Sequence, residues 1–76
     1  MDEQTECLDV RGLKCPLPAL FARRALVRAP PGTSLEVIAD DPLAAVDLPH
    51  MCTQEGFEVL SSVREGSIVR MVLHRP

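Results

Sequence analysis

The sequence predicts an α+β fold, a two-layer sandwich in which two helices cover one face of a four-stranded mixed sheet. Alternating apolar residues predict strands at 6–10 and 34–39 and a hairpin at 57–75. Segments of helical periodicity lie between these strands, which gives the order β-α-β-α-β-β. Because each predicted helix has one apolar face to bury, placing both helices on one face of the sheet is the most economical arrangement.

The chain is long enough for a single domain. It has 76 residues, of which 46% are hydrophobic, and its only large aromatic residues are two phenylalanines. A composition of this kind indicates a globular protein whose core consists of Leu, Val, Ile and Ala. We therefore expect one domain over residues 1–76, with residues 1–5 disordered.

The first strand and the first helix flank a cysteine. In the strand at 6–10, Leu8 and Val10 alternate with polar residues and are expected to face the core. Arg11-Gly12 forms a turn, and the chain then continues as a helix from Cys15 to about Ala29. The sequence PPGT at 30–33 ends that helix, since proline cannot continue it and glycine turns the chain.

The first helix has two different faces on a wheel of 3.6 residues per turn. Its core side contains Pro18, Ala22, Ala25, Leu26 and Ala29, and its opposite side contains Arg23, Arg24 and Arg28. Leu17, Leu20, Phe21 and Val27 do not fit the core side. These four residues predict an exposed apolar patch beside Cys15.

The second half of the chain contains a strand, a helix and a hairpin. In the strand at 34–39, Leu35 and Val37 are expected to be buried. Asp41-Pro42 resembles a helix start, but Pro49 would break a continuous helix and Asp47 could cap a new one. We therefore expect a turn at 42–46 and a helix at 48–55 that ends at Gly56. The segments FEVLSSVR and SIVRMVLHR, separated by Glu65-Gly66, form a hairpin with apolar alternation on both arms.

Charge and cysteine content limit the function classes. The net charge of −3 disfavours direct nucleic-acid binding, which requires a basic surface. The acidic N-terminus lacks a secretory signal, and no apolar run is long enough to cross a membrane. Three unpaired cysteines fit a reducing compartment, so we expect a cytoplasmic protein. Between Val10 and Leu35, however, there are five basic residues and no acidic one.

Cys15 is the strongest candidate for a functional residue. A residue before proline favours extended conformations, which suit a helix N-cap, and Pro16 suits the first helical position. The Cys15 thiol would then lie at the positive end of the helix. That position stabilises a thiolate by ~0.3–1 kcal/mol, and the thiolate is the nucleophile. Because Pro18 lacks an N–H, only the Leu17 amide would remain to cap the thiolate. We expect a moderately lowered thiol pKa.

The other cysteines and the histidines are expected to be structural. Cys7 and Cys52 do not form a C-x-x-C pair with Cys15, so thioredoxin-like exchange is disfavoured, and free cysteines are usually buried. His50 and Cys52 are too close in sequence for a zinc finger, and no second pair exists. We expect no metal and no cofactor, and neither His50 nor His74 can be assigned as a base for Cys15.

Three motifs together resemble the TusA/SirA family of small sulfur-carrier proteins. They are LDVRGLKCPLP, ADDP and DLP, and the similarity extends from Leu8 to His74. The resemblance implies that Cys15 accepts sulfane sulfur as a persulfide and passes it on, with Gly12, Pro16, Leu17 and Pro18 shaping the motif. It also implies mainly structural roles for Asp9, Gly12, Asp41, Asp47 and Pro49.

The resemblance further implies protein partners. The sulfur donor would be a cysteine desulfurase or a rhodanese, and the acceptor a protein of transfer-RNA thiolation, molybdenum cofactor assembly or sulfur oxidation. We expect the docking surface to consist of Arg11, Lys14, Leu20, Phe21, Arg23 and Arg24. A monomer suits a carrier that meets successive partners. The alternative is a non-catalytic regulatory module that binds a partner through the same surface.

Overall fold

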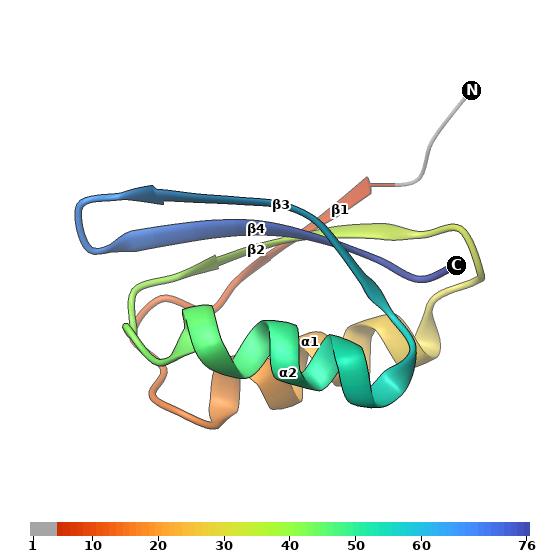
Figure 1. Ribbon diagram of the computed structural model, residues 1–76, viewed down its shortest axis with the longest axis horizontal. Coiled ribbons are helices and arrows are strands. Elements are labelled where there is room, and N and C mark those ends of the chain that lie inside the picture. The colour runs from red at the N-terminus through yellow and green to blue at the C-terminus, as the bar shows by residue number, and fades with distance from the viewer. Residues whose placement is uncertain (1–4) are drawn as a thin grey trace.

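The computed structural model describes residues 5–76 and has the predicted order of elements (Figure 1). The strands are β1 (Thr5–Asp9), β2 (Ser34–Ala39), β3 (Glu58–Glu65) and β4 (Ile68–His74), and the helices are α1 (Leu17–Arg28) and α2 (Ala44–Glu55). The predicted disorder of residues 1–5 falls outside the described residues, except at Thr5, which is the first residue of β1.

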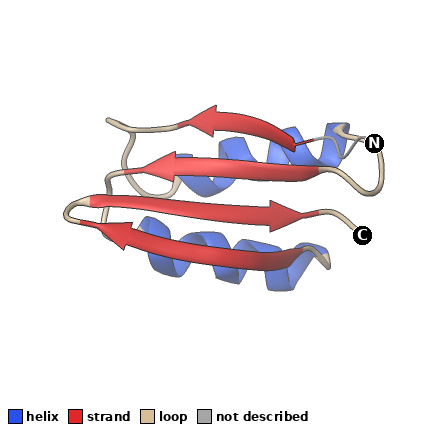
Figure 2. Ribbon diagram, turned by 90° about the horizontal axis from the view of Figure 1, so that it is seen from above, coloured by secondary structure: helices blue, strands red, loops and turns tan. Residues whose placement is uncertain are grey.

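The four strands form one mixed sheet in the order β1-β2-β4-β3. β1 pairs with β2 in parallel, and β4 pairs antiparallel with both β2 and β3. Both helices lie on the same face of the sheet, and the other face is open (Figure 2). The predicted two-layer sandwich is therefore confirmed.

The parallel pairing of β1 and β2 decides where the loops meet. Leu8 is aligned with Val37, so the two strands end at the same edge of the sheet. The Val10 N–H donates to the Ile38 carbonyl at 2.8 Å and extends this pairing beyond β1. The loop that follows β1 and contains Cys15 consequently lies beside the loop that follows β2.

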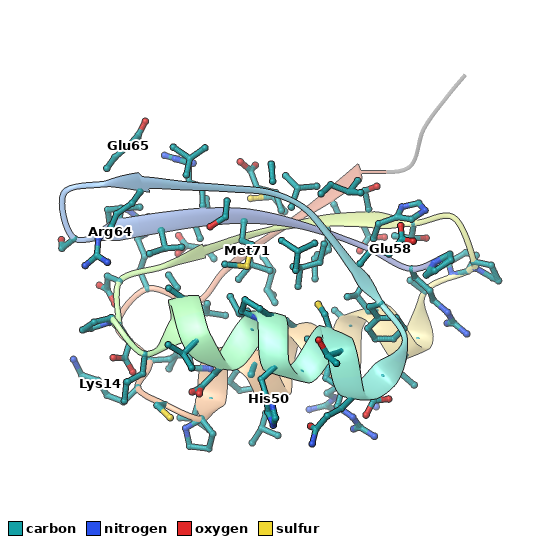
Figure 3. The ribbon with its side chains drawn as sticks, viewed as in Figure 1. Lys14, His50, Glu58, Arg64, Glu65 and Met71 are labelled. Atoms are coloured by element: carbon teal, nitrogen blue, oxygen red, sulfur yellow. The ribbon has the colours of Figure 1, made fainter. Side chains whose placement is uncertain are left out.

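The core lies between the helices and the sheet. Every second residue of β2 and of β4 is buried, and Met71 projects from β4 toward the helices (Figure 3). Leu26 of α1 is 1% exposed and Leu48 of α2 is fully buried. The predicted core positions Pro18, Ala22, Leu26, Leu35 and Val37 are all buried, while Ala25 and Ala29 are half-buried.

The predicted hairpin is confirmed as β3 and β4, but the apolar residues of its first arm are not buried, since all eight residues of β3 are exposed. β3 is an edge strand, and polar residues occupy positions on its helix side: Ser62 is opposite Met71 and Arg64 is opposite Val69. A bulge between Val59 and Ser61 interrupts the alternation further. The hairpin turn is Gly66-Ser67, one residue later than predicted, because Glu65 pairs with Ile68.

The predicted break in the second helix is also wrong. α2 is continuous from Ala44 and includes Pro49. The Leu43 carbonyl accepts the N–H groups of both Val46 and Asp47, at 3.0 and 2.8 Å, so the backbone is helical before Asp47. Pro49 removes one helical hydrogen bond. The helix is held on both sides of Pro49 by buried side chains, Ala44 and Leu48 before it and Met51 after it. The end at Gly56 is as predicted, with φ of 80°.

The described part of the chain contains no helix of the length and apolarity needed to cross a membrane.

Candidate functional site

Two aspartates at the end of β2 anchor the loop that contains Cys15. The Gly12 N–H donates to Asp40 Oδ1 at 2.9 Å, and the Cys15 N–H donates to Asp41 Oδ2 at 2.5 Å. Gly12 has φ of 86°, a conformation that glycine adopts without strain. The parallel strands bring these groups together, so the loop of Cys15 is anchored by residues 26 and 28 positions away in sequence from their partners.

Helix α1 begins one residue later than predicted. Pro16 is the N-cap and Leu17 the first helical residue, so Cys15 precedes the helix and the Cys15–Pro16 peptide bond is cis. The Leu17 N–H donates to the Lys14 carbonyl at 2.8 Å. Pro16 and Pro18 have no N–H to donate. None of the three peptide nitrogens that follow Cys15 therefore donates to its thiol.

The predicted lowering of the Cys15 pKa is wrong in direction. The side chain is exposed, yet its pKa is raised, and the largest cause is the interaction of the thiol with the Asp47 side chain, which favours the protonated form. Partial desolvation and the negative charges of Asp47 and Asp41 act in the same direction. The basic residues of the segment do not offset these carboxylates, so the protonated thiol is favoured more than in an ordinary cysteine.

We expect alkylation of Cys15 by iodoacetamide to have a pH midpoint above that of free cysteine. A raised pKa reduces the thiolate fraction at every pH below it, and the thiolate is the reactive form. The rate should be followed from pH 6 to 11 by mass spectrometry of the peptide that contains Cys15. A midpoint at or below that of free cysteine would show that the helix terminus outweighs Asp47.

A groove of about 360 Å³ separates α1 from α2 on the side away from the sheet. Its lining comes from Pro16, Ala19, Leu20 and Arg23 on one side and Asp47, His50, Met51, Gln54 and Glu55 on the other. Figure 3 shows His50 projecting from α2 away from the sheet and Lys14 on the loop before α1. Pro16, the residue directly after Cys15, and Asp47 line the groove near the N-terminal ends of the two helices.

The structure brings together part of the predicted docking surface. Leu20, which is 53% exposed, and Arg23 line the groove, and Phe21 and Arg24 lie on the exposed side of α1. The predicted apolar patch is confirmed, since Leu17 and Val27 are exposed as well.

The cationic side chains predicted for the docking surface differ in whether they form ion pairs. Arg23 Nε lies 2.8 Å from Glu55 Oε2. Arg11 pairs with Asp9 through two contacts, at 2.7 and 2.9 Å, and this lowers the pKa of Asp9 to about 2. Lys14 and Arg24 form no ion pair within residues 5–76.

The remaining cysteines lie apart from the site. Cys52 is buried, as predicted, and burial raises the pKa of its thiol. Cys7 is exposed, so the expectation of burial is wrong for it. It alternates in β1 with Leu8, which packs against the core, and therefore lies on the open face of the sheet. His74 Nδ1 lies 3.1 Å from Ser34 Oγ across β2 and β4, which is a structural contact.

Sequence reasoning missed the parts that the aspartates play at the site. Asp40 was not assigned to the site, Asp41 was predicted only as a structural helix cap, and Asp47 as the cap of a helix that does not start there. Asp41 does interact with the start of α2 through the Leu43 N–H, at 3.2 Å, but its other oxygen anchors Cys15. The parallel order of β1 and β2 was the only available signal that these loops meet.

Comparisons with known proteins agree on one family. The family model described as "Sulfurtransferase TusA" matches residues 6–75. Two proteins of Neisseria meningitidis, from serogroups A and B, bear the name sulfur carrier protein. Each is 42% identical to this chain over 72 residues, which covers 93% of this chain and 97% of theirs. The crystal structure of a SirA-like protein from Desulfitobacterium hafniense has the same fold, with a TM-score of 0.78 and 20% identity over 90% of this chain and 93% of that one.

Proposed function

We propose that this chain, which belongs to the TusA family of sulfurtransferases, carries sulfane sulfur as a persulfide on Cys15 and relays it between proteins. The observation that carries the proposal is the exposed side chain of Cys15, directly before Pro16, which lines a groove between two helices. Cys52 is buried, and Cys7 lies on the open face of the sheet, whereas the groove is formed by the helices on the other face. Of the three thiols, that of Cys15 is best placed to meet a partner.

Loading is a thiol exchange on sulfur. The Cys15 thiolate attacks the outer sulfur of a persulfide on the donor, a cysteine desulfurase or a rhodanese. A bond forms between Cys15 Sγ and that sulfur, and the S–S bond of the donor breaks. The electron pair remains on the donor's inner sulfur, which takes up the proton that Cys15 released. Release repeats the exchange, with a thiolate of the acceptor protein as the nucleophile.

The raised pKa of Cys15 suits a carrier that retains its cargo. In thiol exchange a leaving sulfur of higher pKa departs more slowly. The carboxylates beside Cys15 disfavour its thiolate, which is the leaving group when the persulfide is attacked. The carried sulfur is consequently held until an acceptor binds.

Sulfur loading can be tested on the whole protein. Incubation with a cysteine desulfurase and cysteine should add one sulfur atom per chain, seen as an increase in intact mass, and a reductant such as dithiothreitol should remove it. Protein alkylated before incubation should gain no sulfur. If unmodified protein gains no sulfur from either a desulfurase or a rhodanese donor, the proposed function is wrong.

We further propose that donors and acceptors dock over α1 beside the groove. The apolar part of this surface comes from Leu17, Leu20 and Phe21, which are 40%, 53% and 39% exposed. The cationic part comes from Lys14 and Arg24, with Arg11 and Arg23 contributing less because they are paired with Asp9 and Glu55. A surface that combines exposed apolar side chains and cations fits partner proteins with an acidic rim.

The docking surface predicts the effect of charge reversal. Replacing both Arg23 and Arg24 by glutamate should slow loading by a donor protein roughly tenfold at low salt, because electrostatic steering is reversed. The effect should shrink as salt screens the charges. The Cys15 alkylation rate should not change, since neither arginine contributes to the raised pKa. Arg64→Glu, on the exposed strand β3, is the matched control. Equal loading rates in both variants would show that these arginines of α1 are not part of the docking surface.

A further inference from the structure

Asp47 has the largest effect on the pKa of the Cys15 thiol, although it was expected to have a structural role. It lies in the first turns of α2 and lines the end of the groove together with Pro16, the residue that follows Cys15. Its Oδ2 atom is buried and has no hydrogen-bond partner within residues 5–76. A buried carboxylate oxygen without a partner is costly, which is unusual for a residue with a purely structural role.

The other charged groups around Cys15 do not neutralise this carboxylate. Asp41 Oδ2 accepts the Cys15 N–H and adds a second negative charge. On the α1 side of the groove, Arg23 is held by Glu55 at 2.8 Å. His50 lines the groove from α2, and Lys14 lies on the loop before α1 (Figure 3). Neither forms an ion pair with Asp47 in the part of the chain that the structure describes.

We propose that Asp47 keeps the Cys15 sulfur protonated while the protein is free, and thereby restricts its reaction with small electrophiles and small persulfides in solution. The inference rests on the proposed function, because it assigns to Asp47 the control of when the carrier sulfur reacts. Its geometric basis is a carboxylate with a buried, unpartnered oxygen that lines the same groove as Pro16, the residue directly after Cys15. The raised pKa of Cys15, for which Asp47 is the largest cause, agrees with it.

The test compares Asp47→Asn with Glu55→Gln. Glu55 lies on the same helix and lines the same groove, so this control removes an equal charge without touching the thiol. In Asp47→Asn the pH midpoint of iodoacetamide alkylation should fall. For each unit that it falls, the thiolate fraction at pH 7 rises about tenfold and its nucleophilicity drops about threefold, so the rate rises about threefold. Above both midpoints the order should reverse, with wild type about threefold faster for each unit of difference, because both thiols are then fully ionised and only nucleophilicity differs.

A second probe separates this inference from the proposed function. Glutathione persulfide should load Asp47→Asn faster than wild type at pH 7, by a factor similar to that seen in alkylation. If wild type cannot be loaded by any persulfide donor, the proposed function fails while the alkylation comparison still tests Asp47.

The inference is overturned if the midpoint of Asp47→Asn equals that of wild type, or if Glu55→Gln lowers it equally. Thermal melting verifies that each variant is folded. If Asp47→Asn does not fold, Asp47→Ser, which also removes the carboxylate, takes its place in the same comparison.

Discussion

Replacement of Cys15 by alanine is expected to abolish sulfur transfer and to leave the fold intact. The side chain is exposed, so its removal costs little packing energy. Cyanide, which removes the outer sulfur of a persulfide as thiocyanate, measures the carried sulfur. After incubation with a cysteine desulfurase and cysteine, wild type should release about one thiocyanate per chain, and Cys15→Ala should release only background.

Cys7→Ala is the matched control, because it removes another exposed thiol, on the open face of the sheet. It should retain the thiocyanate yield of wild type. The contrary result, in which Cys15→Ala keeps its yield and Cys7→Ala loses it, would move the carrier site to β1. If neither substitution affects a partner-dependent activity of the protein, the alternative function as a non-catalytic binding module would be favoured.

Replacement of Leu26 by alanine is expected to lower the free energy of unfolding by about 3 kcal/mol. Leu26 is 1% exposed and anchors α1 to the sheet. A domain of this size has a total stability of roughly 4–11 kcal/mol, so this loss is a large fraction of it. Urea denaturation followed by circular dichroism measures the change.

Leu20→Ala is the control for this prediction, since it makes the same change six residues earlier in the same helix. Leu20 is 53% exposed, so its removal should cost less than about 0.5 kcal/mol. The same variant should slow loading by a donor protein, because Leu20 lines the groove. Equal destabilisation by the two substitutions would contradict the packing of α1 described above.

The parts of the fold that depend on periodicity could be predicted from sequence. The alternation of Leu35 and Val37 placed β2 correctly, and Ala22 and Leu26 marked the buried side of α1. Prediction failed where tertiary packing overrides a local preference. Pro49 argued for a break, but the buried residues around it hold α2 in one piece. The exposure of β3 follows from its place at the edge of the sheet, which local sequence does not specify.

The same division applies to the candidate site. The position of Cys15 before a helix, and the exposed patch of Leu20 and Phe21, follow from local pattern. The ionisation of the thiol does not, because it depends on carboxylates from another part of the chain. Asp47 is 32 positions beyond Cys15, and nothing in its own neighbourhood indicates that it meets a thiol. The basic residues near Cys15 in sequence predicted a lowered thiol pKa, whereas Asp47 raises that pKa.

Locating the carried sulfur on one peptide tests the carrier role of Cys15 most directly. Protein loaded by a desulfurase is alkylated and digested with trypsin, which cuts after Arg11, Lys14, Arg23 and Arg28 and so separates the three cysteines. Residues 15–23 form a peptide whose sole cysteine is Cys15. We predict that mass spectrometry will find the additional sulfur on this peptide. Additional sulfur on the peptides of Cys7 or Cys52 instead would contradict a carrier site at the start of α1.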